Sequence, residues 1–105
     1  MKPSAATQKH ASAYPSARKI KRACENELYR TVKRLGGYIP KEKVELAEKL
    51  YVQKVFLNLQ WIHEHSSNRK VLSDWWDENV SAEIAALWEV DREKLCKAFR
   101  DAFGG

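Results

Sequence analysis

Residues 40–66 read PKEKVELAEKLYVQKVFLNLQWIHEHS, and we expect the rest of the chain to pack around this stretch. Its apolar residues recur at the spacing of an α-helix. From Leu50 onward they spread beyond one narrow stripe, and a helix that is apolar over most of its circumference is one that neighbours cover on several sides. At about 1.5 Å per residue, a continuous helix here is roughly 40 Å long. The stretch therefore predicts a central helical rod.

The composition indicates a single all-α domain. The chain has 105 residues, 44% of them hydrophobic, with only four glycines and three prolines. Runs of alternating β-branched residues are absent, which argues against a sheet. We predict a bundle of four to five helices in one domain over residues 15–105. The predicted helices are 16–35, 41–65, 70–78, 82–88 and 92–102. Residues 1–14 offer almost nothing large to bury, which predicts a flexible, disordered basic tail.

The first predicted helix lies between Pro15 and the glycines at 36 and 37. Proline is favoured near a helix start and glycine just after a helix end. The apolar residues between them follow each other at steps of three or four, so we expect one narrow buried stripe. This stripe consists of Ala17, Ile20, Cys24, Leu28, Val32 and Leu35.

The positive charge is concentrated in the first third of the chain. Residues 1–36 contain nine lysines and arginines against Glu25 and Glu27, a net charge of +7, whereas residues 37–105 have ten against twelve acids, a net charge of −2. Such asymmetry points to an anionic partner, although basic charge also serves solubility. The candidate nucleic-acid-binding residues share one helix face: Arg18, Lys19, Arg22, Tyr29, Arg30, Lys33 and Arg34. Cations neutralise phosphates and an aromatic ring stacks on bases.

Residues 80–99, VSAEIAALWEVDREKLCKAF, resemble a helix-turn-helix motif. Ala85, Val90 and Leu95 match the five-residue spacing of its small and buried positions. The turn position where this motif normally has glycine, because the backbone there is left-handed, is Glu89. The same pattern also suits a purely structural helix pair that closes the bundle.

In this motif Ser81 and Asp91 are suited to be the N-caps of the two helices. The second helix would present basic residues outward as a recognition helix does, although Glu93 and Asp101 dilute that face. These basic residues are Arg92, Lys94, Lys97 and Arg100. We take Arg92 and Lys97 as further candidate nucleic-acid-binding residues.

Trp75 and Trp76 lie in a short predicted helix, 70–78, and adjacent helical residues point about 100° apart. A short helix has difficulty burying both against one core. One of them is therefore a candidate partner-binding anchor. The alternative is that both tryptophans close off the end of the bundle.

The sequence contains little chemistry for catalysis. His63 and His65 are two apart and would point to different sides of a helix, unlike the i, i+4 pair of a zinc helix. Cys24 and Cys96 have no metal-ligand spacing, and Cys24 falls on the buried stripe. We therefore expect no metal, no cofactor and no enzymatic activity.

These observations favour a small nucleic-acid-binding or regulatory protein that acts through the basic helix face. The alternative is a protein-interaction module or homodimeric adaptor that uses the same face for an acidic protein surface, or an exposed tryptophan. No apolar run approaches the roughly 18 residues of a membrane span. The first residues also lack the apolar middle of a secretory signal, so we expect a cytoplasmic protein. Attachment of the first helix to a membrane surface is a weaker alternative, because its apolar stripe has no tryptophan or phenylalanine anchor and is needed for the core, so we expect no membrane partner.

Overall fold

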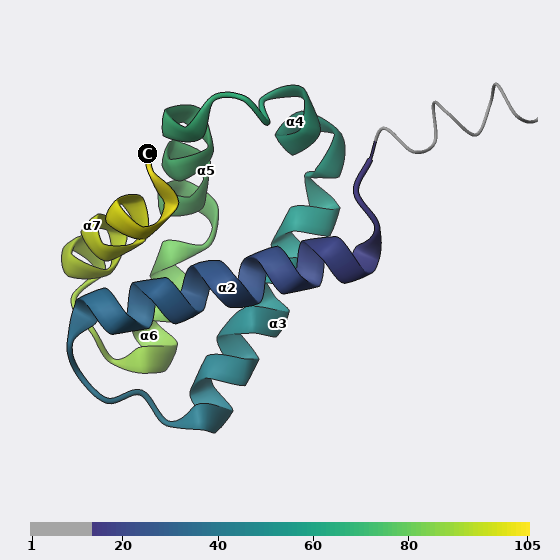
Figure 1. Ribbon diagram of the computed structural model, residues 1–105. Coiled ribbons are helices and arrows are strands. Elements are labelled where there is room, and N and C mark those ends of the chain that lie inside the picture. The colour runs from purple at the N-terminus through teal and green to yellow at the C-terminus, as the bar shows by residue number, and fades with distance from the viewer. Residues whose placement is uncertain (1–13) are drawn as a thin grey trace, which may run out of the picture.

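The computed structural model describes residues 14–105, and this part of the chain is built from helices without a strand (Figure 1). The helices are α2 (Ala17–Leu35), α3 (Lys41–Leu57), α4 (Leu59–Glu64), α5 (Arg69–Asn79), α6 (Ser81–Trp88) and α7 (Arg92–Phe103). The predicted all-α class is confirmed. The predicted tail over residues 1–14 lies outside the described residues, except for Tyr14. Within residues 14–105, no helix combines the length and apolar character that crossing a membrane needs.

The prediction of one continuous helix over 41–65 is wrong, because the helix is interrupted at Asn58. This residue has φ −123° and ψ 25°, outside the helical region. Its side-chain Nδ2 donates to the Lys54 carbonyl at 2.9 Å. Its backbone N–H, which in a continuous helix would bond to that carbonyl, donates instead to the Val55 carbonyl at 3.1 Å. The asparagine side chain thus replaces the backbone N–H as the partner of Lys54. The break divides the predicted rod into α3 and α4 and adds a helix to the expected count.

Neighbours cover α3 on one side only, so the expectation of burial on several sides is also wrong. Ala47, Tyr51 and Val55 are its buried residues. By contrast, Leu46 is 52% exposed and Leu57 is 80% exposed. The reason lies in the packing, since among residues 14–105 α3 packs mainly against α2 and α6. The chain therefore has more apolar residues on this helix than it has core positions for them.

The boundaries of α2 follow from local sequence. Ser16 is its N-cap, and the Ser16 hydroxyl accepts a hydrogen bond from the Lys19 N–H at 3.2 Å. Gly36 ends the helix with φ 79°, a left-handed conformation that glycine adopts without strain. The predicted stripe is buried at Ile20, Cys24 and Leu28. Val32 and Leu35 are half-buried, whereas Ala17 at the start of the helix is exposed.

The molecule is held together where α2 packs against α7 and crosses α3, as Figure 1 shows. At the centre of the core the rings of Trp76 and Phe99 stack, with centroids 3.9 Å apart and planes at 3°. Tyr51 meets both rings edge-on, at centroid distances of 6.2 and 6.1 Å. Residues from α3, α5 and α7 thus share one aromatic cluster, in a geometry that aromatic rings favour.

A polar contact inside this packing joins α2 to α3. The Tyr51 hydroxyl donates a hydrogen bond to the carboxylate of Glu27. Burial raises the pKa of Glu27 above its ordinary value of 4.5, and the hydrogen bond from Tyr51 opposes this effect. The carboxylate therefore carries its charge at a cost to the folded state.

We expect Leu28→Ala to lower the free energy of unfolding by about 2–5 kcal/mol, because the Leu28 side chain is fully buried and its removal leaves a cavity. Leu57→Ala removes the same atoms from a side chain that is 80% exposed, and we expect a change below about 0.5 kcal/mol. Urea unfolding followed by circular dichroism measures both values. Equal effects of the two substitutions would contradict this packing of α2.

We expect Glu27→Gln to raise the free energy of unfolding at pH 7, since glutamine keeps the acceptor for Tyr51 without the buried charge. A raised pKa means that the folded protein binds this proton more tightly than the unfolded chain. The contribution of Glu27 to stability is therefore lost as the pH rises above 4.5 through the raised pKa. The variant should show a smaller decrease over this range in urea unfolding at several pH values. The control is Glu45→Gln, which removes an exposed carboxylate. A Glu27→Gln protein that is less stable than wild type at pH 7 would show that the charge of Glu27 does not destabilise the folded state.

Candidate nucleic-acid interface

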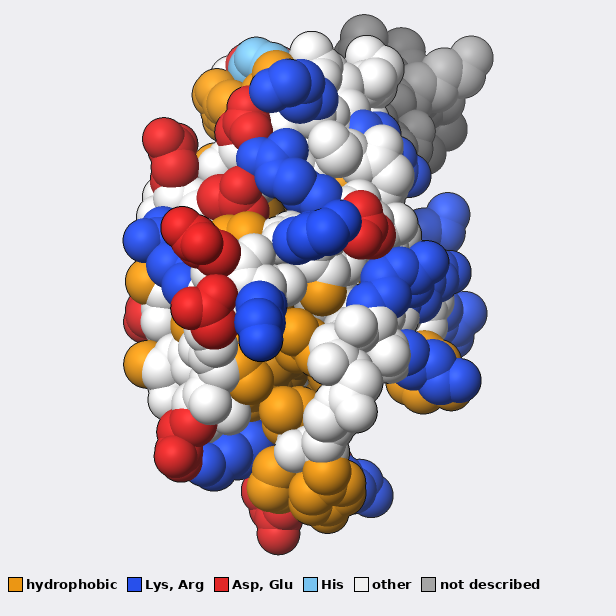
Figure 2. All heavy atoms as spheres, turned by 90° about the vertical axis from the view of Figure 1, so that its left-hand side faces the viewer, with side chains coloured by type: hydrophobic (Ala, Val, Ile, Leu, Met, Phe, Trp, Pro, Cys, Tyr) orange, Lys and Arg blue, Asp and Glu red, His pale blue; other side chains and the backbone are white. Residues whose placement is uncertain are grey.

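The outward side of α2 carries most of the residues predicted to bind nucleic acid, and all of these α2 residues are exposed. We define the basic face of α2 as Arg18, Lys19, Arg22, Tyr29, Arg30, Lys33 and Arg34. Because the opposite stripe of α2 is fixed in the core, the helix cannot turn this face inward. In Figure 2, lysine and arginine side chains gather along the right-hand edge, on the side where α2 lies.

None of the six cations of the basic face forms a salt bridge with an acidic residue among residues 14–105. Arg34 Nη1 only donates to the backbone carbonyl of Arg30, at 3.3 Å. Lys21, which lies outside the face, is the basic residue of α2 that does pair, with Glu25 at 3.9 Å. The positive charge of this face is therefore available to a ligand.

Tyr29 lies within the basic face and is 60% exposed. The ammonium group of Lys33 lies 5.2 Å from the centroid of its ring, a cation–π contact. This contact orients the ring beside a cation at the surface. A nucleobase could stack on the ring while the neighbouring cations contact phosphates.

The C-terminal helix pair has the predicted backbone at its turn and at its second cap. Glu89 has φ 55° and ψ 48°, so the position is left-handed as expected. Asp91 caps α7 by accepting from the Lys94 N–H at 3.0 Å. The prediction for Ser81 is wrong: α6 starts at Ser81 with Val80 as its N-cap, because the Ser81 hydroxyl donates to the Asp77 carbonyl of the preceding turn at 2.5 Å.

The outer cations of α7 are mostly held by intramolecular bonds. Arg92 donates to the Ser81 hydroxyl at 2.9 Å and to the Asp77 carbonyl at 2.7 Å. Lys97 pairs with Asp101 at 3.2 Å. The structure thus places Arg92 and Lys97 in local contacts, unlike the free cations on α2.

Arg100 joins α7 to α5 through two acids. Its guanidinium donates to Asp74 and, at 2.6 Å, to Asp77. The hydrogen bond from Arg100 lowers the pKa of Asp74, which keeps this carboxyl ionised. This part of the candidate recognition helix therefore serves to attach α7 to its neighbour.

The expectation that one of the paired tryptophans is an exposed anchor is wrong. Trp75 is 8% exposed and Trp76 is fully buried. Adjacent residues of a helix point in different directions. Both tryptophans are buried because α6 and α7 both pack on α5. Trp76 reaches the aromatic cluster, and Trp75 lines a pocket beside it. The alternative, closure of the bundle by both residues, describes the structure.

The remaining candidate groups for chemistry are separated or shielded. His63 contacts Tyr14 edge-on, with centroids 4.8 Å apart, while His65 stacks on Trp61 at 4.2 Å. Among residues 14–105 no group of three or more histidine, cysteine and acidic side chains could hold a metal ion. Burial raises the pKa of both the Cys24 and the Cys96 thiols, which keeps them in the weakly nucleophilic thiol form.

The chain matches no protein-family model, no curated protein and no solved structure.

We expect Glu89→Gly to be more stable than Glu89→Ala by about 1 kcal/mol, because alanine keeps the left-handed strain that glycine avoids. Both substitutions remove the exposed ion pair between Glu89 and Lys43, whose atoms are 3.2 Å apart, so their difference isolates the backbone effect. Thermal and urea unfolding of the two variants measures it. An alanine variant as stable as the glycine variant would show that position 89 is not strained.

Proposed function

We propose that this protein binds nucleic acid through the basic face of α2, by contacts to the phosphate backbone and without catalysis. The observation that carries the proposal is the set of six exposed cations on one side of one helix, none of them paired with an acid of the described chain. Phosphate contacts give affinity and position, whereas sequence is read from base edges. We therefore expect little sequence preference.

The geometry of α2 suits an extended anionic ligand. Its cations form two clusters, one at Arg18, Lys19 and Arg22 and the other at Arg30, Lys33 and Arg34. Their centres are about 13 residues apart, or roughly 19 Å along the helix. This distance corresponds to about five to six phosphates of one strand at 3.4 Å each along a duplex. Tyr29 lies between the clusters, where it can stack on an unpaired base.

An acidic protein surface is the second candidate partner of the basic face, in an interaction module or a homodimer. The exposed apolar residues of α3 and α4 favour it, since protein interfaces combine apolar and charged contacts. These residues include Leu46, Phe56, Leu57 and Trp61. Such a partner would contact both the basic face and these apolar side chains.

Binding of labelled random-sequence duplex DNA and single-stranded RNA, followed by fluorescence anisotropy over a series of salt concentrations, tests the proposal. If six phosphates are neutralised on DNA, log K should fall against log salt with a slope of about −5. Absence of binding at low salt would overturn nucleic-acid binding. Analytical ultracentrifugation of the protein alone then tests the homodimer.

A pair of charge-reversal variants locates the surface. We expect Arg18→Glu with Arg22→Glu to lower the affinity at least about tenfold and to reduce the slope by about 2. The matched control is Lys41→Glu with Lys94→Glu, which changes the net charge equally at exposed cations outside the basic face. Both control residues lie in the first turn of a helix, where glutamate is favourable. Equal losses in the two proteins would mean that only net charge matters, and would contradict a site on α2.

A further inference from the structure

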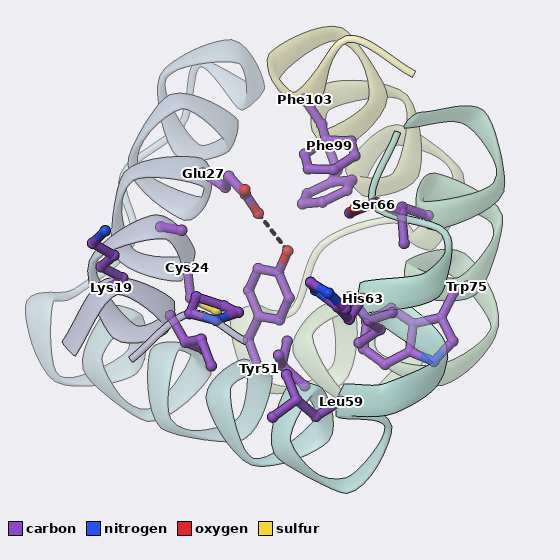
Figure 3. A pocket seen from close by; sticks show the side chains of 16 residues that line it. Lys19, Cys24, Glu27, Tyr51, Leu59, His63, Ser66, Trp75, Phe99 and Phe103 are labelled. Carbon is purple, nitrogen blue, oxygen red and sulfur yellow. Dashed lines mark hydrogen bonds between the residues drawn. The ribbon is translucent and has the colours of Figure 1, made fainter. Parts of the chain in front are cut away.

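A pocket of about 500 Å³ lies on the inner side of α2, between this helix and residues of α3, α4, α5 and α7. This volume is within the range of small-molecule sites. The pocket is distinct from the basic face, since Lys19 is the only residue that belongs to both. Figure 3 shows the ammonium group of Lys19 extending outward, away from the centre of the pocket.

The walls of the pocket are mainly apolar and aromatic. Tyr51, Trp75, Phe99 and Phe103 contribute rings from three different helices. Phe99 and Phe103 are stacked, with centroids 5.2 Å apart and planes at 17°, and form one wall in Figure 3. Aromatic faces carry negative charge density and attract cations that have left water.

The carboxylate of Glu27 is the only acidic group in the lining. It points into the pocket toward Tyr51, whose hydroxyl donates to Oε1 (Figure 3). No other hydrogen bond from residues 14–105 reaches this carboxylate, so Oε2 is available to a ligand. A partly buried carboxylate with one neutral donor is stabilised further when a cation approaches it.

We propose that this pocket binds a small organic ammonium ion whose charged group pairs with Glu27 and whose apolar body lies against the rings of Tyr51, Trp75 and Phe99. An organic anion is disfavoured because Glu27 would repel it in a site of low dielectric constant. A neutral apolar compound would fill the space but bring no positive charge to Oε2 of Glu27. The combination of a carboxylate and aromatic walls thus selects an ammonium ion with an apolar substituent.

Titration of the full chain with 2-phenylethylammonium and cyclohexylammonium, followed by ¹H–¹⁵N NMR spectra, tests this proposal. The neutral and anionic comparison probes are 2-phenylethanol and 3-phenylpropanoate. We expect the ammonium probes to shift signals of the pocket residues and to bind at least about tenfold more tightly than the other two, as expected for a charge-assisted contact. Absence of shifts with millimolar ammonium probe, or equal affinity for the alcohol, would overturn the proposal.

Two variants identify the pocket and its acid. Glu27→Gln should weaken binding of the ammonium probes by about tenfold and leave binding of the alcohol unchanged, whereas Glu45→Gln, outside the lining, should change neither. Ala23 lines the pocket at an exposed helical position, so Ala23→Phe can obstruct the pocket without disturbing the core. We expect this variant to bind none of the probes. Unchanged ammonium affinity in either the Glu27 or the Ala23 variant would show that the ion binds elsewhere.

Discussion

The structure depends on the burial of one narrow stripe of α2 against α3 and α7. Ile20, Cys24 and Leu28 lie in the core, and these contacts fix the rotation of the helix about its own axis. Once the rotation is fixed, every other residue of α2 has a defined direction. The basic face points to solvent, and Glu27 points between the helices. A single hydrophobic constraint thus positions both sites proposed for this protein.

The same constraint explains why the cations of α2 and α7 differ. The outer side of α7 lies beside α5, whose Asp74 and Asp77 accept hydrogen bonds from Arg100. In the described part of the chain, no acidic side chain pairs with a cation of the basic face of α2. The exposed pair of Lys97 with Asp101 contributes little to stability, whereas the half-buried bonds of Arg100 attach α7 to α5. The unpaired cations on α2 repel one another, a cost that an anionic ligand would remove.

Local interactions could be read from the sequence, whereas contacts between distant segments could not. Gly36, Glu89 and Asp91 behave as expected because a helix end depends on the residue at that end. The helix break at Asn58 could not be predicted, because the apolar helical periodicity of the sequence continues across it. The break comes from a hydrogen bond between the Asn58 side chain and the Lys54 carbonyl. Burial of Trp75 and Trp76 depends on α6 and α7 packing on α5, which no local pattern reveals.

The arrangement of the candidate site residues could therefore be predicted only where a local pattern was sufficient. The basic face follows from helical periodicity on a single helix, so its arrangement could be predicted. The pocket could not be, because its lining combines residues such as Glu27, Tyr51 and Phe99 that are far apart in the chain. Glu27 in particular looks like an ordinary surface acid in the sequence. Only the opposing Tyr51 hydroxyl reveals that it faces inward.

The basic face of α2 is proposed to bind anions and the pocket beside Glu27 to bind a cation. Because both sites lie on one helix, binding at one should favour binding at the other. An ammonium ion beside Glu27 would neutralise the acid nearest the core side of α2 and make the potential over this helix more positive. Phosphates on the basic face would then be attracted more strongly, and by thermodynamic linkage they would strengthen ammonium binding equally. Salt screens charges over about 8 Å at physiological ionic strength, so this coupling is weak on the solvent side. It acts mainly through the interior of the helix, where screening is smaller.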